Sequence, residues 1–176
     1  MNALLGFAKR VDRISIAFGR LLAWLSVFMV LAGAFNAVAR YGGRAFGVNL
    51  SSNGLLEAQW YLFALVFLLG AAPTLAVDRH VRVDVFYSRL SRRHQALIDF
   101  LGCLFLLLPF CVFALVTSLP FVESAWSVWE VSPDPGGLPR WPIKTAIPVA
   151  FVLLMIQGLS FAVQRLAVIQ GTEGGS

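Results

Sequence analysis

Charged residues are scarce in this 176-residue chain. Asp, Glu, Lys and Arg make up 13% of the residues and hydrophobic types make up 59%, whereas soluble proteins average about 25% charged and about 45–50% apolar residues. The mean hydropathy is correspondingly high, at +0.78. So few polar side chains cannot cover a water-soluble fold of this length, and the composition therefore indicates a membrane protein.

Reactive and metal-binding residues are also few, with two cysteines and two histidines. Cys103 and Cys111 share one apolar block and would lie about 12 Å apart along a helix, too far for a disulfide, so both are predicted to be packing residues. His80 and His94 fall in a basic segment, outside the apolar blocks that would hold a membrane haem. The sequence contains no Cys, His and carboxylate cluster with metal-ligand spacing, and no GxxxxGK(S/T) or GxSxG motif. We therefore expect no enzyme, no cofactor and no metal site.

Four apolar blocks without a charged residue account for the hydrophobic content. They cover residues 21–39, 58–77, 100–122 and 145–164. About 20 residues at about 1.5 Å each cross the roughly 30 Å hydrocarbon core, and helices are expected because lipid offers the backbone no hydrogen-bond partners. We predict an all-α integral membrane protein, a single domain of residues 1–170 with transmembrane helices at about 21–40, 57–77, 97–122 and 143–165.

Basic residues divide unevenly between the segments that connect these blocks. Ten lie on one side of the predicted membrane and four on the other. The larger group is Lys9, Arg10, Arg13, Arg20, Arg79, Arg82, Arg89, Arg92, Arg93 and Arg165; the smaller is Arg40, Arg44, Arg140 and Lys144. The positive-inside rule then places both termini in the cytoplasm. The loops are too short to form a basic nucleic-acid-binding surface, so no nucleic-acid partner is expected.

Residues 3–19, before the first block, have an amphipathic pattern. Apolar side chains recur every three or four residues, whereas Lys9, Asp12 and Arg13 fall on another face. This spacing predicts an interfacial helix on the cytoplasmic leaflet, with a bend at Gly19. An extension of the first transmembrane helix fits equally well, because no proline interrupts the pattern. At the other end, the glycine-rich tail 171–176 is expected to be disordered.

Polar residues within or near the apolar blocks are Asn36, Thr74, Thr117, Ser118 and Gln157. We expect these side chains to form hydrogen bonds with neighbouring helices. A carrier that moves ions by itself usually has ionisable or broken-helix features at mid-membrane depth. Because the blocks contain no ionisable residue, the pattern favours a structural partner of a larger membrane protein.

The segment 123–141 is the longest on the side opposite the termini. It is rich in proline and glycine, which predicts a rigid, turned loop, and it contains Trp126, Trp129 and Glu130. Tryptophans at such a position usually form a belt at the membrane interface. Docking of another protein is the alternative.

Two sequence stretches are not explained by membrane insertion: EAQWYLF at 57–63 and DRHVRVDVFY at 78–87. Together with PDPGGLPRWPIK at 133–144 and IQG at 156–158, they make the chain resemble the small membrane subunit (DctQ-like) of tripartite ATP-independent periplasmic (TRAP) transporters. The resemblance covers roughly residues 20–165. Pro73 and the Ala76-Val77 pair depart from the family pattern.

The resemblance implies a non-catalytic scaffold subunit in the bacterial inner membrane. Its partners would be a large TRAP membrane subunit, a periplasmic substrate-binding protein and membrane phospholipids. The complex would use a sodium gradient to import an organic acid or related solute, with the sodium and substrate sites in the large subunit. The alternative is a stand-alone four-helix membrane protein that self-associates or modulates another membrane protein.

Candidate residues for contact with a partner or with lipid fall into two groups. Arg79, Arg82 and Asp84 are the main candidates on the cytoplasmic side, although the arginines alone could simply set the topology. Glu57 begins a helix, where the macrodipole favours a carboxylate. The cytoplasmic group is Arg79, His80, Arg82, Asp84 and Tyr87; the outer group is Glu57, Trp60, Tyr61, Trp126, Trp129, Glu130, Arg140, Trp141 and Lys144.

Overall fold

A computed structural model describes residues 2–45, 47, 52–78 and 87–171 of the chain. In these ranges the regular structure is helical: α1 (Asn2–Ala45), α2 (Asn53–Ala76), α4 (Arg92–Gly102), the π-helix η1 (Cys103–Leu107), α5 (Leu108–Ser127) and α6 (Trp141–Ile169). Helix α4, η1 and α5 form one continuous rod. Within the part of the chain that the structure describes, four helices are long and apolar enough to cross a membrane: Ala3–Gly43, Asn53–Ala76, Arg92–Ser127 and Trp141–Ile169. The predicted all-α fold with four transmembrane helices is thus confirmed.

The first helix is longer than a single membrane span. Residues 3–19 and the first apolar block belong to the same 44-residue helix, α1, which continues through Gly19. A separate interfacial helix would have required a break there, so α1 agrees with the alternative in which these residues extend the first span. Their depth relative to a lipid surface stays a prediction. The predicted disordered tail comprises residues 171–176, and all of it except Gly171 lies outside the described residues.

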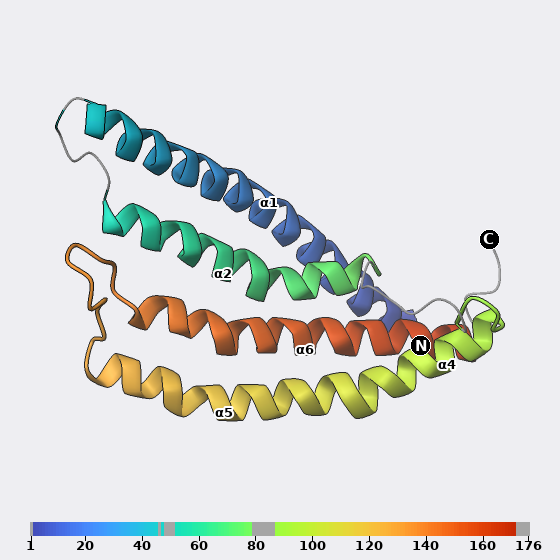
Figure 1. The fold of residues 1–176 in the computed structure, drawn as a ribbon. Coiled ribbons are helices and arrows are strands. Elements are labelled where there is room, and N and C mark those ends of the chain that lie inside the picture. Colours follow the sequence, from blue (N-terminus) through green and yellow to red (C-terminus); the bar gives the residue numbers. More distant parts are fainter. Residues whose placement is uncertain (1, 46, 48–51, 79–86, 172–176) are drawn as a thin grey trace.

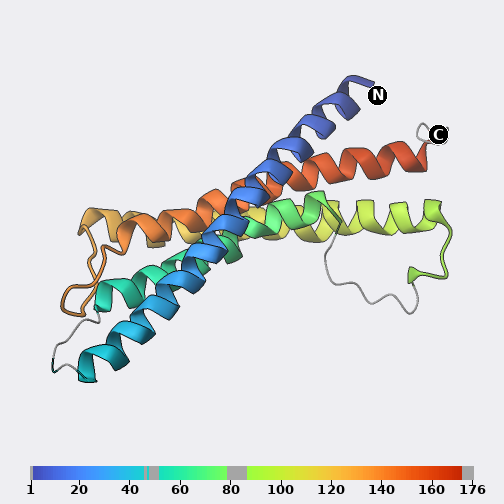
Figure 2. The ribbon, with the colours of Figure 1, turned by 90° about the horizontal axis from the view of Figure 1, so that it is seen from above.

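The helices form a layer in which α6 is central (Figure 1). Helix α6 contacts α1, α2, α4 and α5, and α1 also packs on α2. Helices α2 and α5 lie on opposite sides of α6. Seen from above, α1 crosses α2 and α6 obliquely (Figure 2). The start of α1 and the end of α6 lie at one end of this layer, called here the terminal end, and the segment 128–140 lies at the other, the loop end.

Burial is concentrated in α6. In the most apolar part of this helix 39% of the residues are buried, against 11% in each of the other three spans. The central core cluster joins Leu75, Cys111, Leu154 and Phe161 to Cys103. Both cysteines are buried and unpaired, which confirms their prediction as packing residues.

The π-helix η1 lies where two helices approach closely. The Cys103 thiol donates a hydrogen bond to the Gly158 carbonyl on α6, over 3.1 Å. A Cβ atom at position 158 would lie 3.1 Å from Leu107 Cδ2, closer than ordinary van der Waals contact. Gly158 therefore permits this helix contact.

The polar residues in the spans differ from expectation. Thr74, Thr117 and Ser118 donate to carbonyls of their own helices, at 2.7, 2.8 and 2.8 Å, so the predicted interhelical bonds are wrong for these three. Such back-bonding satisfies a hydroxyl without a neighbouring helix. Asn36 is buried, and its Oδ1 atom has no hydrogen-bond partner in the described part of the chain. Gln157 does bond to another helix, as predicted.

Candidate functional site

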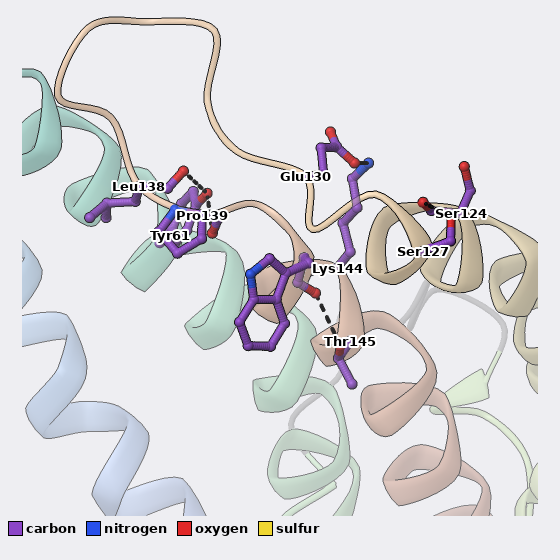
Figure 3. A network of polar contacts seen from close by, with 9 residues as sticks. Tyr61, Ser124, Ser127, Glu130, Leu138, Pro139, Lys144 and Thr145 are labelled. Carbon is purple, nitrogen blue, oxygen red and sulfur yellow. Dashed lines mark hydrogen bonds and ion pairs between the residues drawn. The ribbon is translucent and has the colours of Figure 1, made fainter.

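Two polar clusters, one at each end of the layer, contain the candidate residues that the structure describes. At the loop end, Glu57 occupies the second turn of α2 and is 3% exposed. Its carboxylate accepts hydrogen bonds from the Ser132 hydroxyl and the Leu138 backbone N–H. One turn later, the Tyr61 hydroxyl donates to the Pro139 carbonyl over 3.0 Å (Figure 3). Glu57 is thus more than a carboxylate that the helix dipole favours at this position, because it fastens the loop to α2.

The loop itself is closed by backbone hydrogen bonds. Val131 and Pro139 form an isolated antiparallel bridge, and the N–H of Ser132 donates to the Leu138 carbonyl over 3.1 Å. Gly136 has φ +72°, and a Cβ atom at Gly137 would lie 2.4 Å from Ser132 Cβ. Side chains are therefore excluded where the loop turns against Glu57. The predicted turned loop is confirmed.

Three tryptophans join the end of α5 to the start of α6. Ring centroids are 4.4 Å apart for Trp126 and Trp141, 5.2 Å for Trp129 and Trp141, and 5.9 Å for Trp126 and Trp129. Trp126 Nε1 also donates to the Thr145 hydroxyl over 2.9 Å. Trp129, in the left-handed region with φ +49°, ends this connection and remains 62% exposed.

Charged side chains lie near other aromatic rings of the loop end. Lys144 forms an ion pair with Glu130 (Figure 3), and its ammonium nitrogen lies 4.0 Å from the centre of the Phe121 ring. The Arg140 guanidinium lies 6.0 Å from the centre of the Trp60 ring. All nine outer candidates therefore gather at the loop end, on α2, α5, α6 and the loop between the last two helices.

At the terminal end, Arg165 connects three segments. Its guanidinium forms ion pairs with Asp78, over 2.6 Å, and with Asp99, over 3.1 Å. Tyr87 donates to the same Asp99 carboxylate over 2.8 Å. Among the cytoplasmic candidates only Tyr87 is described; Arg79, His80, Arg82 and Asp84 lie outside the described residues. Sequence reasoning named Arg165 only for topology, although charges of opposite sign that flank apolar blocks at one membrane face signal such pairing.

A second polar group at the terminal end fastens α1 to α6. One Asp12 oxygen accepts from the Gln157 amide, at 2.7 Å, and the Ser160 hydroxyl, at 3.0 Å. The other accepts from Gln164 at 2.7 Å, and Ser15 donates to Gln157 Oε1 at 2.7 Å. The sequence analysis placed Asp12 on the polar face of residues 3–19 and named no partner for it; the structure supplies three donors from α6. The available signal was the polar stripe at positions 157, 160 and 164, which shares one face of α6.

These clusters hold helices together and carry no reactive arrangement. No group of three or more His, Cys, Asp or Glu residues that could hold a metal ion occurs within the described ranges. The carboxylates of Glu57, Glu130, Asp12 and Asp99 each accept from or pair with groups of a different segment. The site is therefore a set of fixed helix connections, suited to keeping the layer rigid.

A comparison with protein families gives one finding. The family described as tripartite ATP-independent periplasmic transporters, DctQ component, matches residues 29–168, which include the whole loop-end cluster and the Arg165 ion pairs. Nothing among curated proteins or solved structures matches this chain.

Proposed function

Because the chain belongs to the DctQ-component family of tripartite ATP-independent periplasmic transporters, we propose that it is the stationary scaffold of a sodium-driven importer for an organic acid or related solute. The chain is the non-catalytic membrane component of a transporter, a multi-pass protein of the inner membrane. A tripartite transporter also implies a large membrane subunit and a periplasmic binding protein as partners.

The thinness of the helix layer is the observation that carries the scaffold proposal. Among the spans in the described ranges, only α6 is substantially buried, whereas in each of the other three 11% of the residues in the most apolar part are buried. Large side chains on the outward faces are exposed, among them Phe35 at 62%, Phe67 at 71% and Phe113 at 67%. Such a layer presents broad apolar faces on which a larger membrane subunit could pack at membrane depth.

Rigidity is what a stationary subunit requires, and the two end clusters supply it. At the loop end, Glu57 and the tryptophans connect α2, α5 and α6. At the terminal end, Asp12 connects α1 to α6 and Arg165 connects α6 to α4 and the end of α2. Every transmembrane helix is therefore cross-connected near an end, so the helices cannot slide past each other without breaking polar contacts.

The absence of ionisable residues from the apolar blocks supports ion coupling elsewhere in the proposed complex. The 21–39, 58–77, 100–122 and 145–164 blocks have no ionisable residue, and sodium or carboxylate solutes need polar ligands at membrane depth. We assign those sites to the large subunit. This chain then needs no cofactor and binds no solute.

For the membrane orientation we keep both termini in the cytoplasm, so that the loop end faces the periplasm. An exposed apolar patch there consists of Val128, Trp129 and Val131, which are 70, 62 and 66% exposed. Because the loop is fastened by Glu57, the patch is held in place for the large subunit or the periplasmic binding protein. The predicted contacts of Arg79, His80, Arg82 and Asp84 with lipid or partner belong to the cytoplasmic side.

Affinity purification from mild detergent, followed by mass spectrometry, tests the subunit role. We expect stoichiometric recovery of a large multi-span membrane protein together with this chain. Recovery of this chain alone as a stable homo-oligomer would refute the proposal and support the stand-alone alternative. In liposomes, sodium-dependent uptake should require the large subunit, and flux through this chain alone would contradict a scaffold role.

The patch can be tested in the same complex with one pair of variants. Val131→Lys introduces a charge into the patch at the loop end, whereas Leu90→Lys introduces the same charge at an exposed position, 38% exposed, at the terminal end. We expect Val131→Lys to reduce uptake driven by the binding protein and Leu90→Lys to leave it unchanged. Equal uptake in both variants would remove the patch from the docking surface.

A further inference from the structure

An apolar groove runs along one face of α6, between α2 and α5. It consists of two hollows of about 310 and 740 Å³, and Leu68 lines both. On α6 the lining passes from Ile143 and Ile147 in the first hollow to Ala150 and Leu154 in the second. These positions are spaced by four, three and four residues, so they share one helix face. The two hollows therefore follow one another along the same face of α6, and together they are called the groove.

The walls of the groove follow the same register. Phe121 lines the first hollow and Phe110 the second, from positions three turns apart on α5. At its inner end the groove meets α1 at Gly19, Leu22 and Ser26. From Ile143 to Leu154 the groove extends about 16 Å along α6, roughly half of the 30 Å hydrocarbon core. Its length therefore matches one leaflet of a bilayer.

Only the mouth of the groove, at the loop end, carries charge. Arg140 and Lys144 line the first hollow, and the other described residues that line the two hollows are uncharged. Lys144 is paired with Glu130, but Arg140 Nε is buried and has no hydrogen-bond partner within the described part of the chain. The N-terminus of α6, with its partial positive charge, begins at the same mouth.

We propose that this groove binds one glycerophospholipid from the leaflet at the loop end. The phosphate lies against Arg140 and Lys144, and one acyl chain lies along the α6 face toward Leu154. A cationic mouth above an apolar channel of leaflet length complements an amphiphile with an anionic head, because guanidinium groups bind phosphate through several directed hydrogen bonds. An apolar helix from a partner protein would fill the channel but bring no anion to Arg140 and Lys144 at its mouth. This inference rests on the groove and not on the transporter role.

Native mass spectrometry of the purified chain, titrated with palmitoyl-oleoyl phosphatidylglycerol, tests the headgroup contact. We expect one tightly held lipid per chain, and Arg140→Gln should weaken its binding about tenfold because charge-assisted hydrogen bonds are lost. Arg40→Gln is the matched control, since Arg40 is an exposed cation at the same end on α1, outside the groove. Equal binding by all three proteins, or equal loss in both variants, would overturn the proposal.

A second pair of variants tests the channel and remains informative if Arg140→Gln fails to fold. Ala64→Phe fills the first hollow, whereas Ala37→Phe adds the same ring to an exposed position of α1. We expect Ala64→Phe to abolish the lipid adduct and Ala37→Phe to preserve it. A lipid adduct that survives Ala64→Phe would refute lipid occupancy, and loss of a co-purifying membrane protein in that variant would then assign the groove to a protein helix.

Discussion

Glu57 is the residue on which the loop end depends most directly. Its buried carboxylate holds two donors from positions 75 and 81 residues further along the chain, so it connects α2 to the loop beside the hydrogen bonds that Tyr61 and Asn53 donate to loop carbonyls. Gly137 makes this possible by leaving no side chain between Ser132 and the carboxylate. The carboxylate thus does the work of a cross-link between segments far apart in sequence.

Replacing Glu57 should release the loop without unfolding the helices. In Glu57→Ala the Ser132 hydroxyl and the Leu138 N–H lose their acceptor, and we expect cleavage by endoproteinase Asp-N before Asp134 to accelerate about tenfold. Glu123→Ala is the control, because Glu123 is an exposed carboxylate on α5. Unchanged cleavage in Glu57→Ala would show that the backbone bridge and the hydrogen bonds from Tyr61 and Asn53 hold the loop without Glu57.

The ion pair between Glu130 and Lys144 permits a charge-swap experiment. The side chains are 28 and 18% exposed, respectively, so Glu130→Lys and Lys144→Glu should each place like charges together and lower the stability of the purified chain. The double swap should recover about 1 kcal/mol of coupling free energy, measured from thermal unfolding of all four proteins. Strictly additive effects would mean that the pair contributes nothing to stability.

Several residue-scale features could be predicted from the sequence, but their pairings could not. The composition and position of the outer candidates indicate a polar and aromatic end, and the structure brings all nine together there. That Glu130 pairs with Lys144, and Glu57 with the loop, depends on how a proline-rich turn directs the chain between helices. Residue spacing does not determine such a path. The partners of Asp12 were missed because an amphipathic pattern shows which face is polar and does not show which neighbour supplies polar partners.

At the scale of the elements, α1 is held to α6 by the Asp12 group rather than by apolar packing alone. Asp12→Leu would leave the amide of Gln157, which is 1% exposed, without its acceptor, whereas Ser160 keeps the Ala8 carbonyl as an acceptor. We expect a loss of about 2 kcal/mol in the free energy of unfolding. Hydrogen exchange should also accelerate at the start of α1. Adding Gln157→Leu should cost less than the sum of the single changes, since both buried partners become apolar. Full additivity would contradict direct coupling.

The contact between α6 and the π-helix η1 makes a separate prediction. Gly158→Val adds atoms where even a Cβ lies 3.1 Å from Leu107 and 3.5 Å from the Cys103 sulfur, so we expect a loss of about 1–3 kcal/mol in thermal or denaturant unfolding. Gly102→Ala is the control, because nothing lies within 4 Å of a Cβ there. If Gly158→Val is as stable as the control, the two helices are not in fixed contact at this point.

The number of helices and their approximate bounds follow from the sequence, because the charged residues are separated by apolar blocks about as long as a helix that crosses the bilayer. The length of α1 does not follow, since a helix without proline can continue past the membrane or lie along it with the same residue pattern. The π-turn at Cys103–Leu107 leaves no signal in the apolar sequence CLFLL. It is visible only in the packing against Gly158.

At the scale of the whole molecule, the layer has much outward surface for its size. A compact four-helix bundle buries one face of every helix, whereas here α6 alone is buried from several sides. The polar clusters at the two ends compensate for weak packing in the middle, because they cross-connect helices whose apolar faces are mostly turned outward. This division, with fixed ends and broad apolar faces, suits a subunit that supports a larger membrane protein.

A supporting role predicts that the stability of this chain depends on its partner. Binding to the folded state adds RT ln(1 + [L]/Kd), about 2.7 kcal/mol at a hundredfold excess over Kd, and for a chain of this size about 2–4 °C accompanies each kcal/mol. Purified together with its large subunit, this chain should therefore unfold at a temperature about 5–10 °C higher than alone. The measurement is the loss of monodisperse protein on heating. Excess phospholipid without the large subunit is the control for stabilisation by lipid. Equal midpoints with lipid and with the large subunit would mean that the outward faces are built for lipid, and the scaffold role would then have to rest on the end clusters alone.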